Sequence, residues 1–321
     1  MDWARPQKCL ANSALNMPFQ YTIGRPVEAA GVGLHTAVQS HLRLVPAPAG
    51  TGIVFCRTDL DGFRIEAHVG NVARVSYATS LMKQGVLLST TEHLLAALYS
   101  CGVDNVFIEI DNLEVPILDG SAQPFIQMLQ RAGLRRLRRR RTYLKVVRAL
   151  EVSDGDRRIG IYPHDDFTVS CFVDYAHPKV GRQEIEIRVN RDTFGRELAT
   201  ARTFGFMSDF EGLRAMGLIR GGSLENAIVL SADDILNGPV RFADEFVRHK
   251  ALDLIGDLAL IGRPLKARVV AHKAGHALHT QLVTRLLADP TLWIETTVES
   301  ERDAGSAAPV LRAVVPAPAT D

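Results

Sequence analysis

The order of strand-like and helix-like segments occurs twice along this chain, and that repeat constrains the fold more than any other feature. The first block starts near Phe19 and includes HLRLV at 41–45, where polar and apolar residues alternate as in a half-buried strand. The second block, from about Tyr143 to Leu287, has four strand-like segments, a mixed segment and a long helix over 244–262. We therefore predict an α+β fold made of two similar units, although the two blocks show no residue-level identity.

Two further helices are predicted in the first block. In STTEHLLAALYSCG (89–102), Ser89 or Thr90 can cap the N-terminus, and Gly102 follows the last turn. The segment PFIQMLQRAGL (124–134) begins with proline and has a glycine near its end, which is the usual asymmetry of helix ends.

An arginine-rich run, Arg135 to Arg141, separates the two blocks. We interpret it as a solvated linker; a nucleic-acid-binding patch is the alternative. The run lacks interleaved aromatic residues and the formal net charge of the chain is only +1, so we favour the linker. The predicted organisation is a loose leader at 1–18, an N-terminal α+β domain at 19–134, a basic linker at 135–142, a C-terminal α+β domain at 143–290 and a polar, Ala/Pro-rich tail at 291–321.

Composition predicts a soluble cytoplasmic protein. Hydrophobic residues make up 46% of the chain and charged residues 23%, as in ordinary globular proteins. The N-terminal segment lacks the apolar core of a signal peptide, and no uncharged apolar run approaches the roughly 18 residues of a membrane span. The four cysteines are far apart, so we expect free thiols in a reducing compartment and no cysteine-based metal site. Peripheral contact with a membrane stays open.

A candidate metal site begins at HKALD (249–253). On a helix, His249 and Asp253 lie one turn apart on one face, where both can reach a single metal ion. Imidazole nitrogen and carboxylate oxygen are both good zinc ligands. Asp257 continues this face and can support a site residue without itself binding the metal. For this motif alone, an ordinary His–Asp pair on a helix surface is the alternative.

The dipeptide Glu92-His93, within TTEH (90–93), is the second element of the candidate site. Adjacent helix residues point about 100° apart, so His93 can bind a metal while Glu92 stands beside the activated water. A general base needs this proximity without coordination. A surface glutamate next to a packed histidine is the alternative.

GHALH (275–279) supplies the third element. His276 sits where a loop enters a helix, and a protonated histidine there can act as a general acid. Asp257 can hold it protonated and orient it. A solvent-facing histidine is the alternative for His276, and His279 has no assigned role.

Together these residues make a hydrolytic mechanism. His93, His249 and Asp253 provide three protein ligands and leave one position for water, which is the pattern of catalytic zinc. Glu92 would take the proton of the water, and His276 would protonate the departing amine.

Two more residues could stabilise the charge that develops on the carbonyl oxygen. Lys250 is next to a ligand and adds positive charge, and Thr203 could donate a hydrogen bond to the same oxygen. A ligand set of two histidines and one aspartate binds several divalent ions, so Fe2+ can compete with Zn2+.

Six motifs, in this order, closely resemble the UDP-3-O-acyl-N-acetylglucosamine deacetylase family, whose members carry out the committed step of lipid A synthesis in Gram-negative bacteria. They are STTEHLLAAL, PILDGSAQPF, ARTFGFM, GGSLENAIV, FADEFVRHKALDLIGDL and HKAGHALH, and the resemblance runs from about Phe19 to about Pro290. It implies two similar domains, each a layer of strands packed on a layer of helices, with the active site between them.

The resemblance implies the same zinc ligands, general base and general acid as the mechanism above. It also implies that Asp257 is the partner of His276, that Lys250 contacts the substrate and that Thr203 assists the oxyanion. An insert in the C-terminal domain would form an apolar passage for the acyl chain. The substrate-binding candidates are Lys250, Arg157, Phe204, Met207, Phe210, Ala227 and Val229. The expected substrate is a UDP-linked acylated amino sugar that loses its N-acetyl group as acetate, and we expect a monomer with no nucleic-acid partner.

Two other functions stay open from the sequence. A metal hydrolase acting on a different acylated amine would use the same zinc apparatus. A non-enzymatic protein that holds nucleic acid through the arginine run would need no zinc and would bind with steep salt dependence.

Overall fold

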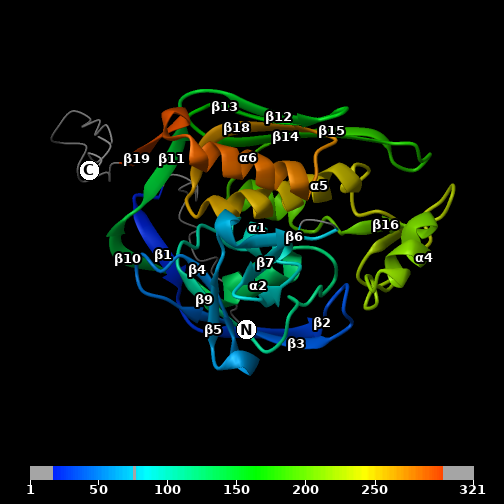
Figure 1. Cartoon of the computed structure of the whole chain (residues 1–321), viewed down its shortest axis with the longest axis horizontal. Coiled ribbons are helices and arrows are strands. Elements are labelled where there is room, and N and C mark those ends of the chain that lie inside the picture. Colours follow the sequence, from blue (N-terminus) through cyan, green and yellow to red (C-terminus); the bar gives the residue numbers. More distant parts are fainter. Residues whose placement is uncertain (1–16, 75–76, 299–321) are drawn as a thin grey trace, which may run out of the picture.

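The computed structural model describes residues 17–74 and 77–298, and its main elements stack in four layers (Figure 1). A sheet forms each outer layer, and two layers of helices lie between the sheets. Helices α1 (Glu92–Ser100) and α2 (Gln123–Ala132) belong to the N-terminal half, and α5 (Glu245–Leu258) and α6 (His276–Ala288) to the C-terminal half. The predicted α+β fold is therefore confirmed.

The N-terminal sheet has five strands in the order β2-β3-β9-β4-β5. The neighbours pair antiparallel except β9 and β4, which run parallel. Buried and exposed residues alternate along β3, so one face of this strand packs on the helices, as its period-two pattern predicts. The strands are β2 (Val27–Val32), β3 (Gln39–Pro46), β4 (Ile53–Arg57), β5 (Phe63–Glu66) and β9 (Val106–Ile110).

The C-terminal sheet has seven strands, and β18 (Leu265–His272) lies at its centre. β18 pairs antiparallel with β13 on one side; on the other side it pairs in parallel first with β11 and then with β14. Its other members are β11 (Thr142–Val146), β12 (Leu150–Asp154), β13 (Arg157–Pro163), β14 (Phe167–Tyr175), β15 (Gly181–Arg188) and β19 (Trp293–Thr297).

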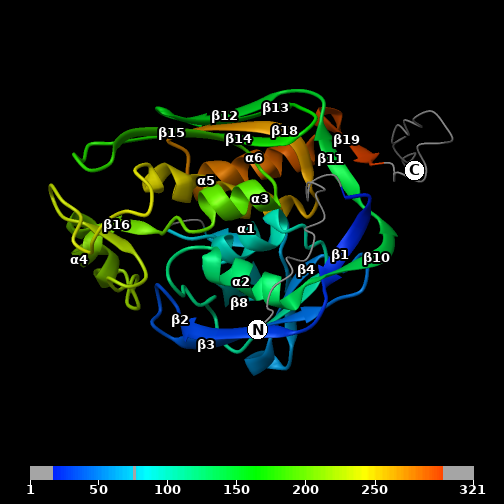
Figure 2. The ribbon, with the colours of Figure 1, turned by 180° about the vertical axis from the view of Figure 1, so that it is seen from behind.

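Smaller elements complete the described chain. Strand β16 (Phe204–Phe206) pairs in parallel with β17 (Ile228–Leu230), and α4 (Met207–Ala215) follows β16 at one end of the molecule (Figure 2). The others are β1 (Phe19–Ile23), β6 (Val72–Arg74), β7 (Ser80–Lys83), β8 (Val86–Leu88), β10 (Leu134–Arg140), the short helix α3 (Arg191–Thr193), a π-helical turn at Phe194–Leu198 and 3-10 turns at Thr58–Leu60, Val69–Asn71, Ala259–Ile261 and Pro290–Leu292.

One detail of the sequence prediction, the cap of α1, needs correction, and the structure adds detail to two others, the arginine-rich run and the tail. Neither Ser89 nor Thr90 caps α1; the helix follows Thr91, and the Thr90 hydroxyl instead donates to Glu114. Most of the arginine-rich run forms strand β10, which pairs antiparallel with β1. The expected tail begins with an ordered strand, β19, which pairs with β11.

The expected leader and most of the expected tail lie beyond the part of the chain that the structure describes. Residues 1–16 of the expected leader and 299–321 of the expected tail lie outside the described residues. The division into domains at 19–134 and 143–290 also stays a prediction. Within the described chain, no helix combines the length and the apolar composition needed to cross a membrane.

A close contact between α1 and α5 brings the two halves together. Gly256 of α5 lies against the backbone of Glu92 at the start of α1, and a Cβ at position 256 would overlap the Glu92 carbonyl group. All nine residues of α1 are buried, because the helix has neighbours on every side. The absence of a side chain at Gly256 therefore sets how close Glu92 and His93 come to α5.

We predict that Gly256→Ala destabilises the fold by roughly 1–3 kcal/mol, the usual cost of overpacking a buried contact. It should also reduce activity, because the helix that carries Glu92 must move. Thermal unfolding monitored by circular dichroism measures the first effect. Gly212→Ala in α4 is the matched control, since its Cβ would meet nothing within 4 Å and alanine favours a helix. Equal unfolding temperatures for Gly256→Ala and the wild type would contradict the prediction.

Candidate active site

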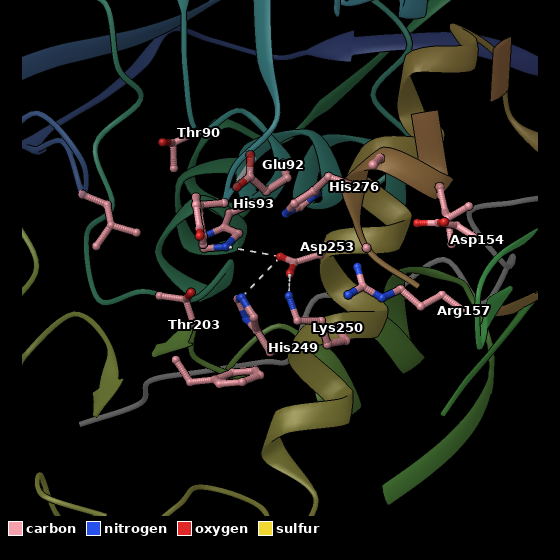
Figure 3. Close-up of a pocket in the computed structure, with 16 residues that line it drawn as sticks. Thr90, Glu92, His93, Asp154, Arg157, Thr203, His249, Lys250, Asp253 and His276 are labelled. Atoms are coloured by element: carbon pink, nitrogen blue, oxygen red, sulfur yellow. Dashed lines mark hydrogen bonds and ion pairs between the residues drawn. The ribbon is translucent and has the colours of Figure 1, made fainter. Parts of the chain in front are cut away.

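A cavity of about 330 Å³ lies between the N-terminal ends of α1 and α6 and the buried face of α5 (Figure 3). It brings together residues that are far apart in the sequence. Nine of the predicted site residues line it: Glu92, His93, Arg157, Thr203, Phe204, His249, Lys250, Asp253 and His276.

Three potential metal ligands converge on one side of this cavity. The Nε2 atoms of His249 and His93 lie 3.2 Å and 3.6 Å from Oδ1 of Asp253. One ligand atom from each of the three residues lies within 4.8 Å of the others, and all three side chains are buried. Helix α5 provides His249 and Asp253 one turn apart, as their spacing predicts, and the start of α1 provides His93.

The histidine at position 249 is oriented for coordination. Its Nδ1 lies 3.1 Å from the carbonyl oxygen of Ala201, which can only accept, so Nδ1 carries the proton and Nε2 keeps its lone pair. Burial lowers the pKa of His249 to about 4, despite the opposing effect of Asp253. The imidazole is therefore neutral at physiological pH, which is the form that binds metals.

Asp253 stays ionised in the buried site. Burial alone would raise its pKa, but His249 and Lys250 together hold the pKa well below its usual range. Lys250 Nζ lies 3.0 Å from Oδ2 of Asp253, on the opposite side of the carboxylate from the histidines. The same carboxylate raises the pKa of Lys250 against the effect of burial, so Lys250 remains an ammonium.

Glu92 lies beside the ligand group and belongs to no metal-ligand cluster in the described part of the chain. Its Oε2 accepts a hydrogen bond of 3.1 Å from the backbone N–H of Thr79. Burial raises the pKa of Glu92, while His276 and His93 act in the opposite direction. A buried carboxylate with a raised pKa is a stronger base than an exposed one.

His276 begins helix α6 and is tied to α5. Its Nδ1 donates to Oδ2 of Asp257 over 2.7 Å, and Asp257 is fully buried. Burial disfavours the imidazolium, but Asp257 outweighs that effect and raises the pKa of His276 to about 9. Burial alone would raise the pKa of Asp257, but the charge and hydrogen bond of His276 lower it to about 2. His276 is therefore charged at neutral pH, and within the described residues its hydrogen bonds use Nδ1 and not Nε2.

His279 shares the carboxylate of Asp257. Its Nδ1 donates to the same Oδ2 over 2.8 Å, one turn along α6 from His276. Burial lowers the pKa of His279, so this ring is a neutral donor. No role was expected for His279, although its position three residues after His276 on a helix is a signal that the two side chains share a face.

Thr203 and Phe204 reach the cavity at the start of β16, where Gly120 holds the backbone of Thr203. The N–H of Thr203 donates to the carbonyl of Gly120 over 2.8 Å. Gly120 has φ of +81°, and a side chain there would overlap the backbone of Asn226, so this approach needs glycine. The ring of Phe204 lies below Lys250, whose Nζ is 5.6 Å from its centroid.

The remaining residues predicted to contact the substrate do not all line the same cavity. Arg157 extends from the start of β13 toward the cavity. Met207 lines a second cavity, together with Tyr175 and Phe206. Within the described chain, the lining of these two cavities does not include Phe210, Ala227 or Val229.

Several lining residues received no role from the sequence. They are Leu34, Tyr77, Asp154, Ala277 and Leu278, and Thr90 was considered only as a cap. Their spacing along the chain contains no signal of a shared site, because the fold alone brings Leu34 of the N-terminal half and Asp154 of the C-terminal half to the same cavity.

Comparison with known proteins shows the family to which this chain belongs. Residues 20–288 match the family described as UDP-3-O-acyl N-acetylglycosamine deacetylase. The chain belongs to this family. A relative from Solibacter usitatus (strain Ellin6076), named UDP-3-O-acyl-N-acetylglucosamine deacetylase, is 55% identical over 278 residues, which cover 86% of this chain and 94% of the relative.

Two other members of the family carry the same name. The relative from Anaeromyxobacter dehalogenans (strain 2CP-C) is 46% identical over 299 residues, covering 93% of this chain and 96% of its own length. The relative from Myxococcus xanthus (strain DK1622) is 46% identical over 276 residues, covering 85% and 88%. The resemblance inferred from the motifs is confirmed.

The His276–Asp257 pair predicts a pH dependence of stability. Because the pKa of His276 rises from 6.5 to about 9 on folding, the pair stabilises the fold fully below pH 6.5. That contribution, on the order of 3 kcal/mol, is lost as pH rises toward 9. Urea unfolding between pH 6 and 9.5 should show a steeper loss for the wild type than for His276→Gln. If the free energy of unfolding had the same pH dependence in both proteins, the raised pKa of His276 would be contradicted.

Proposed function

We propose that this protein is a zinc-dependent hydrolase that removes the N-acetyl group from UDP-3-O-(3-hydroxyacyl)-N-acetylglucosamine and releases acetate, the committed step of lipid A synthesis. One observation carries the proposal. His93, His249 and Asp253, whose donor atoms suit a zinc ion, line one cavity. The same cavity is lined by a buried carboxylate, Glu92, and a charged imidazole, His276. The names of the relatives in the same family support the substrate.

The donor set fits a zinc ion. His93, His249 and Asp253 would hold it, since two imidazole nitrogens and a carboxylate oxygen converge there and His249 is held in the neutral form. When bound, zinc supplies a Lewis acid that polarises the acetamide carbonyl and lowers the pKa of a water molecule. Iron in the Fe2+ state suits the same donors and can compete for them in the cell.

Glu92 is the proposed general base. It takes a proton from water as the water oxygen forms a bond to the acetyl carbonyl carbon. The N–H of Thr79 fixes one carboxylate oxygen of Glu92, which leaves the other to face the water. Its raised pKa makes the proton transfer more favourable than for an exposed glutamate.

His276 is the proposed general acid. The C–N bond of the amide breaks only if the nitrogen receives a proton, because an unprotonated amine anion is a very poor leaving group. The imidazolium of His276 donates that proton, and Asp257 keeps the ring charged before the transfer and oriented during it. The products are acetate and the free amino group on the sugar.

Lys250 and Thr203 are proposed to stabilise the oxygen of the tetrahedral intermediate. The ammonium of Lys250 lies at the cavity wall, held by Asp253 and the face of Phe204. Thr203 lies at the same cavity with its backbone fixed, so its hydroxyl can turn toward a developing charge.

The two ends of the substrate would leave the reaction centre in different directions. Arg157 at the cavity lining provides a positive charge for the diphosphate of UDP. Phe204 lies at the active-site cavity, and its ring centroid is 5.7 Å from that of Tyr175, which lines the second cavity with Met207. We propose that the acyl chain passes along these aromatic rings. For Phe210, Ala227 and Val229, contact with the acyl chain stays a prediction.

We also propose that the protein acts as a monomer in the cytoplasm. Cys56, Cys101 and Cys171 are buried free thiols, which suits a reducing compartment.

Replacing the proposed base tests the mechanism. In Glu92→Gln, kcat for acetate release should fall on the order of 10²–10⁴-fold, the usual contribution of a general base. Zinc content, measured by mass spectrometry of the metal, should stay at the wild-type level because Glu92 is not in the ligand group. Glu28→Gln on the exposed face of β2 is the control and should keep full activity. Substantial turnover by Glu92→Gln would exclude it as the base.

Metal removal tests the cofactor and the substrate together. Chelation should abolish release of acetate from the acylated UDP-sugar, and one equivalent of Zn2+ per chain should restore it. The same assay with N-acetylglucosamine, which lacks both UDP and the acyl chain, should show little turnover, because the two groups expected to hold the substrate in the site are missing. Equal rates on both compounds would indicate a hydrolase for a different acylated amine.

A further inference from the structure

Thr79 has no assigned role, yet it is the one residue of the described chain that hydrogen-bonds to both the proposed base and the partner of the proposed acid. It directly precedes β7 and is completely buried. Its N–H donates to Oε2 of Glu92 over 3.1 Å. Its hydroxyl donates to Oδ1 of Asp257 over 2.5 Å, and the hydroxyl oxygen lies 3.2 Å from Nδ1 of His276, from which it can accept. The two carboxylates belong to different helices and different halves of the molecule.

The backbone of Thr79 is itself held in place by α1. Its carbonyl oxygen accepts hydrogen bonds from the N–H of Thr91 at 3.3 Å and from the Thr91 hydroxyl at 3.1 Å. All the polar groups of Thr79 are therefore used, and none of them contacts the cavity directly. A residue with this set of contacts acts on substrate only through its neighbours.

The hydroxyl of Thr79 completes the hydrogen bonds of Asp257. Oδ2 already accepts from Nδ1 of His276 and Nδ1 of His279. Among the described residues, Thr79 is the donor that serves Oδ1. Without it, a buried carboxylate oxygen would lose its partner, and the carboxylate could turn away from His276 to find another.

We propose that Thr79 is a positioning residue for the hydrolysis, holding Glu92 and the Asp257–His276 pair in one arrangement on either side of the reacting amide. This inference rests on the proposed function, since it assigns Glu92 and His276 their roles. The contact to Glu92 comes from the backbone and survives any substitution at position 79 except proline, so side-chain changes act on the Asp257–His276 pair alone. The hydroxyl is therefore the part of Thr79 that mutagenesis can test.

The experiment compares Thr79→Val and Thr79→Ser in the acetate-release assay with the zinc-loaded enzyme. Valine keeps the shape and removes the donor, so kcat should fall roughly tenfold to a hundredfold, the equivalent of one hydrogen bond to a charged group. KM should change by less than about twofold, because Thr79 does not line the cavity. Serine keeps the donor and should restore kcat to within about threefold of the wild type.

Thr22→Val is the matched control, since Thr22 is also completely buried and its hydroxyl accepts a hydrogen bond from the N–H of Ala47. It should lose stability and keep kcat. If Thr79→Val does not fold, Thr79→Cys replaces it: the thiol is a weak donor, and kcat should fall well below that of Thr79→Ser.

Three results would overturn the inference while leaving the proposed function intact. They are an unchanged kcat in Thr79→Val or Thr79→Cys, an increase in KM alone, and a Thr79→Ser variant as slow as the valine variant. A wild-type enzyme that releases no acetate from the acylated UDP-sugar would instead contradict the proposed function, and the role of Thr79 with it.

Discussion

The contact between α1 and α5 at Gly256 is the constraint on which the rest of the site depends. Helix α5 has no side chain at this point, and the backbone of Glu92 occupies the space. The close approach brings the first turn of α1 against the face of α5 that carries Asp253 and Asp257. A wider separation would leave buried carboxylates and imidazoles without partners, and each unpaired charge would be costly in the interior.

Two aspartates on the same helix, one turn apart, have different electrostatic surroundings. Asp253 faces two histidines through one oxygen and Lys250 through the other. Asp257 faces two histidines of α6 and the hydroxyl of Thr79. The histidines beside them are in opposite states: burial keeps His249 neutral despite Asp253, whereas Asp257 outweighs burial and keeps His276 charged. The proposed hydrolysis uses both states at the same pH, because neutral donors bind a metal and a charged acid protonates the amine.

Helical periodicity explains how much of this site was predictable from the sequence. The spacing of His249, Asp253 and Asp257 needs no tertiary information, since residues four apart on a helix share a face. The adjacency of Glu92 and His93 is equally local. The order of the motifs then indicated the family, and with it the roles of the residues that these local patterns only suggest.

Contacts between distant segments could not be predicted in this way. Thr79 and Asp257 are 178 residues apart, and a lone threonine before a short strand has no distinguishing pattern. The strand conformation of the arginines of β10 was not predictable for a related reason. Charge suggested a solvated linker, but pairing with β1 decides the backbone conformation and leaves the charged side chains at the surface of a strand.

The distribution of the site over α1, α5 and α6 has a consequence for biosynthesis. A ribosome completes the first helix long before it translates the other two, so Glu92 and His93 exist for many seconds as part of a hydrophobic helix whose covering layer has not yet been made. The mostly apolar remainder of α1 must stay protected during that interval, by provisional contacts or by chaperones. Any messenger truncated before the codon of His276 would yield a chain with an exposed core and without the proposed general acid, a natural substrate for cellular proteolysis.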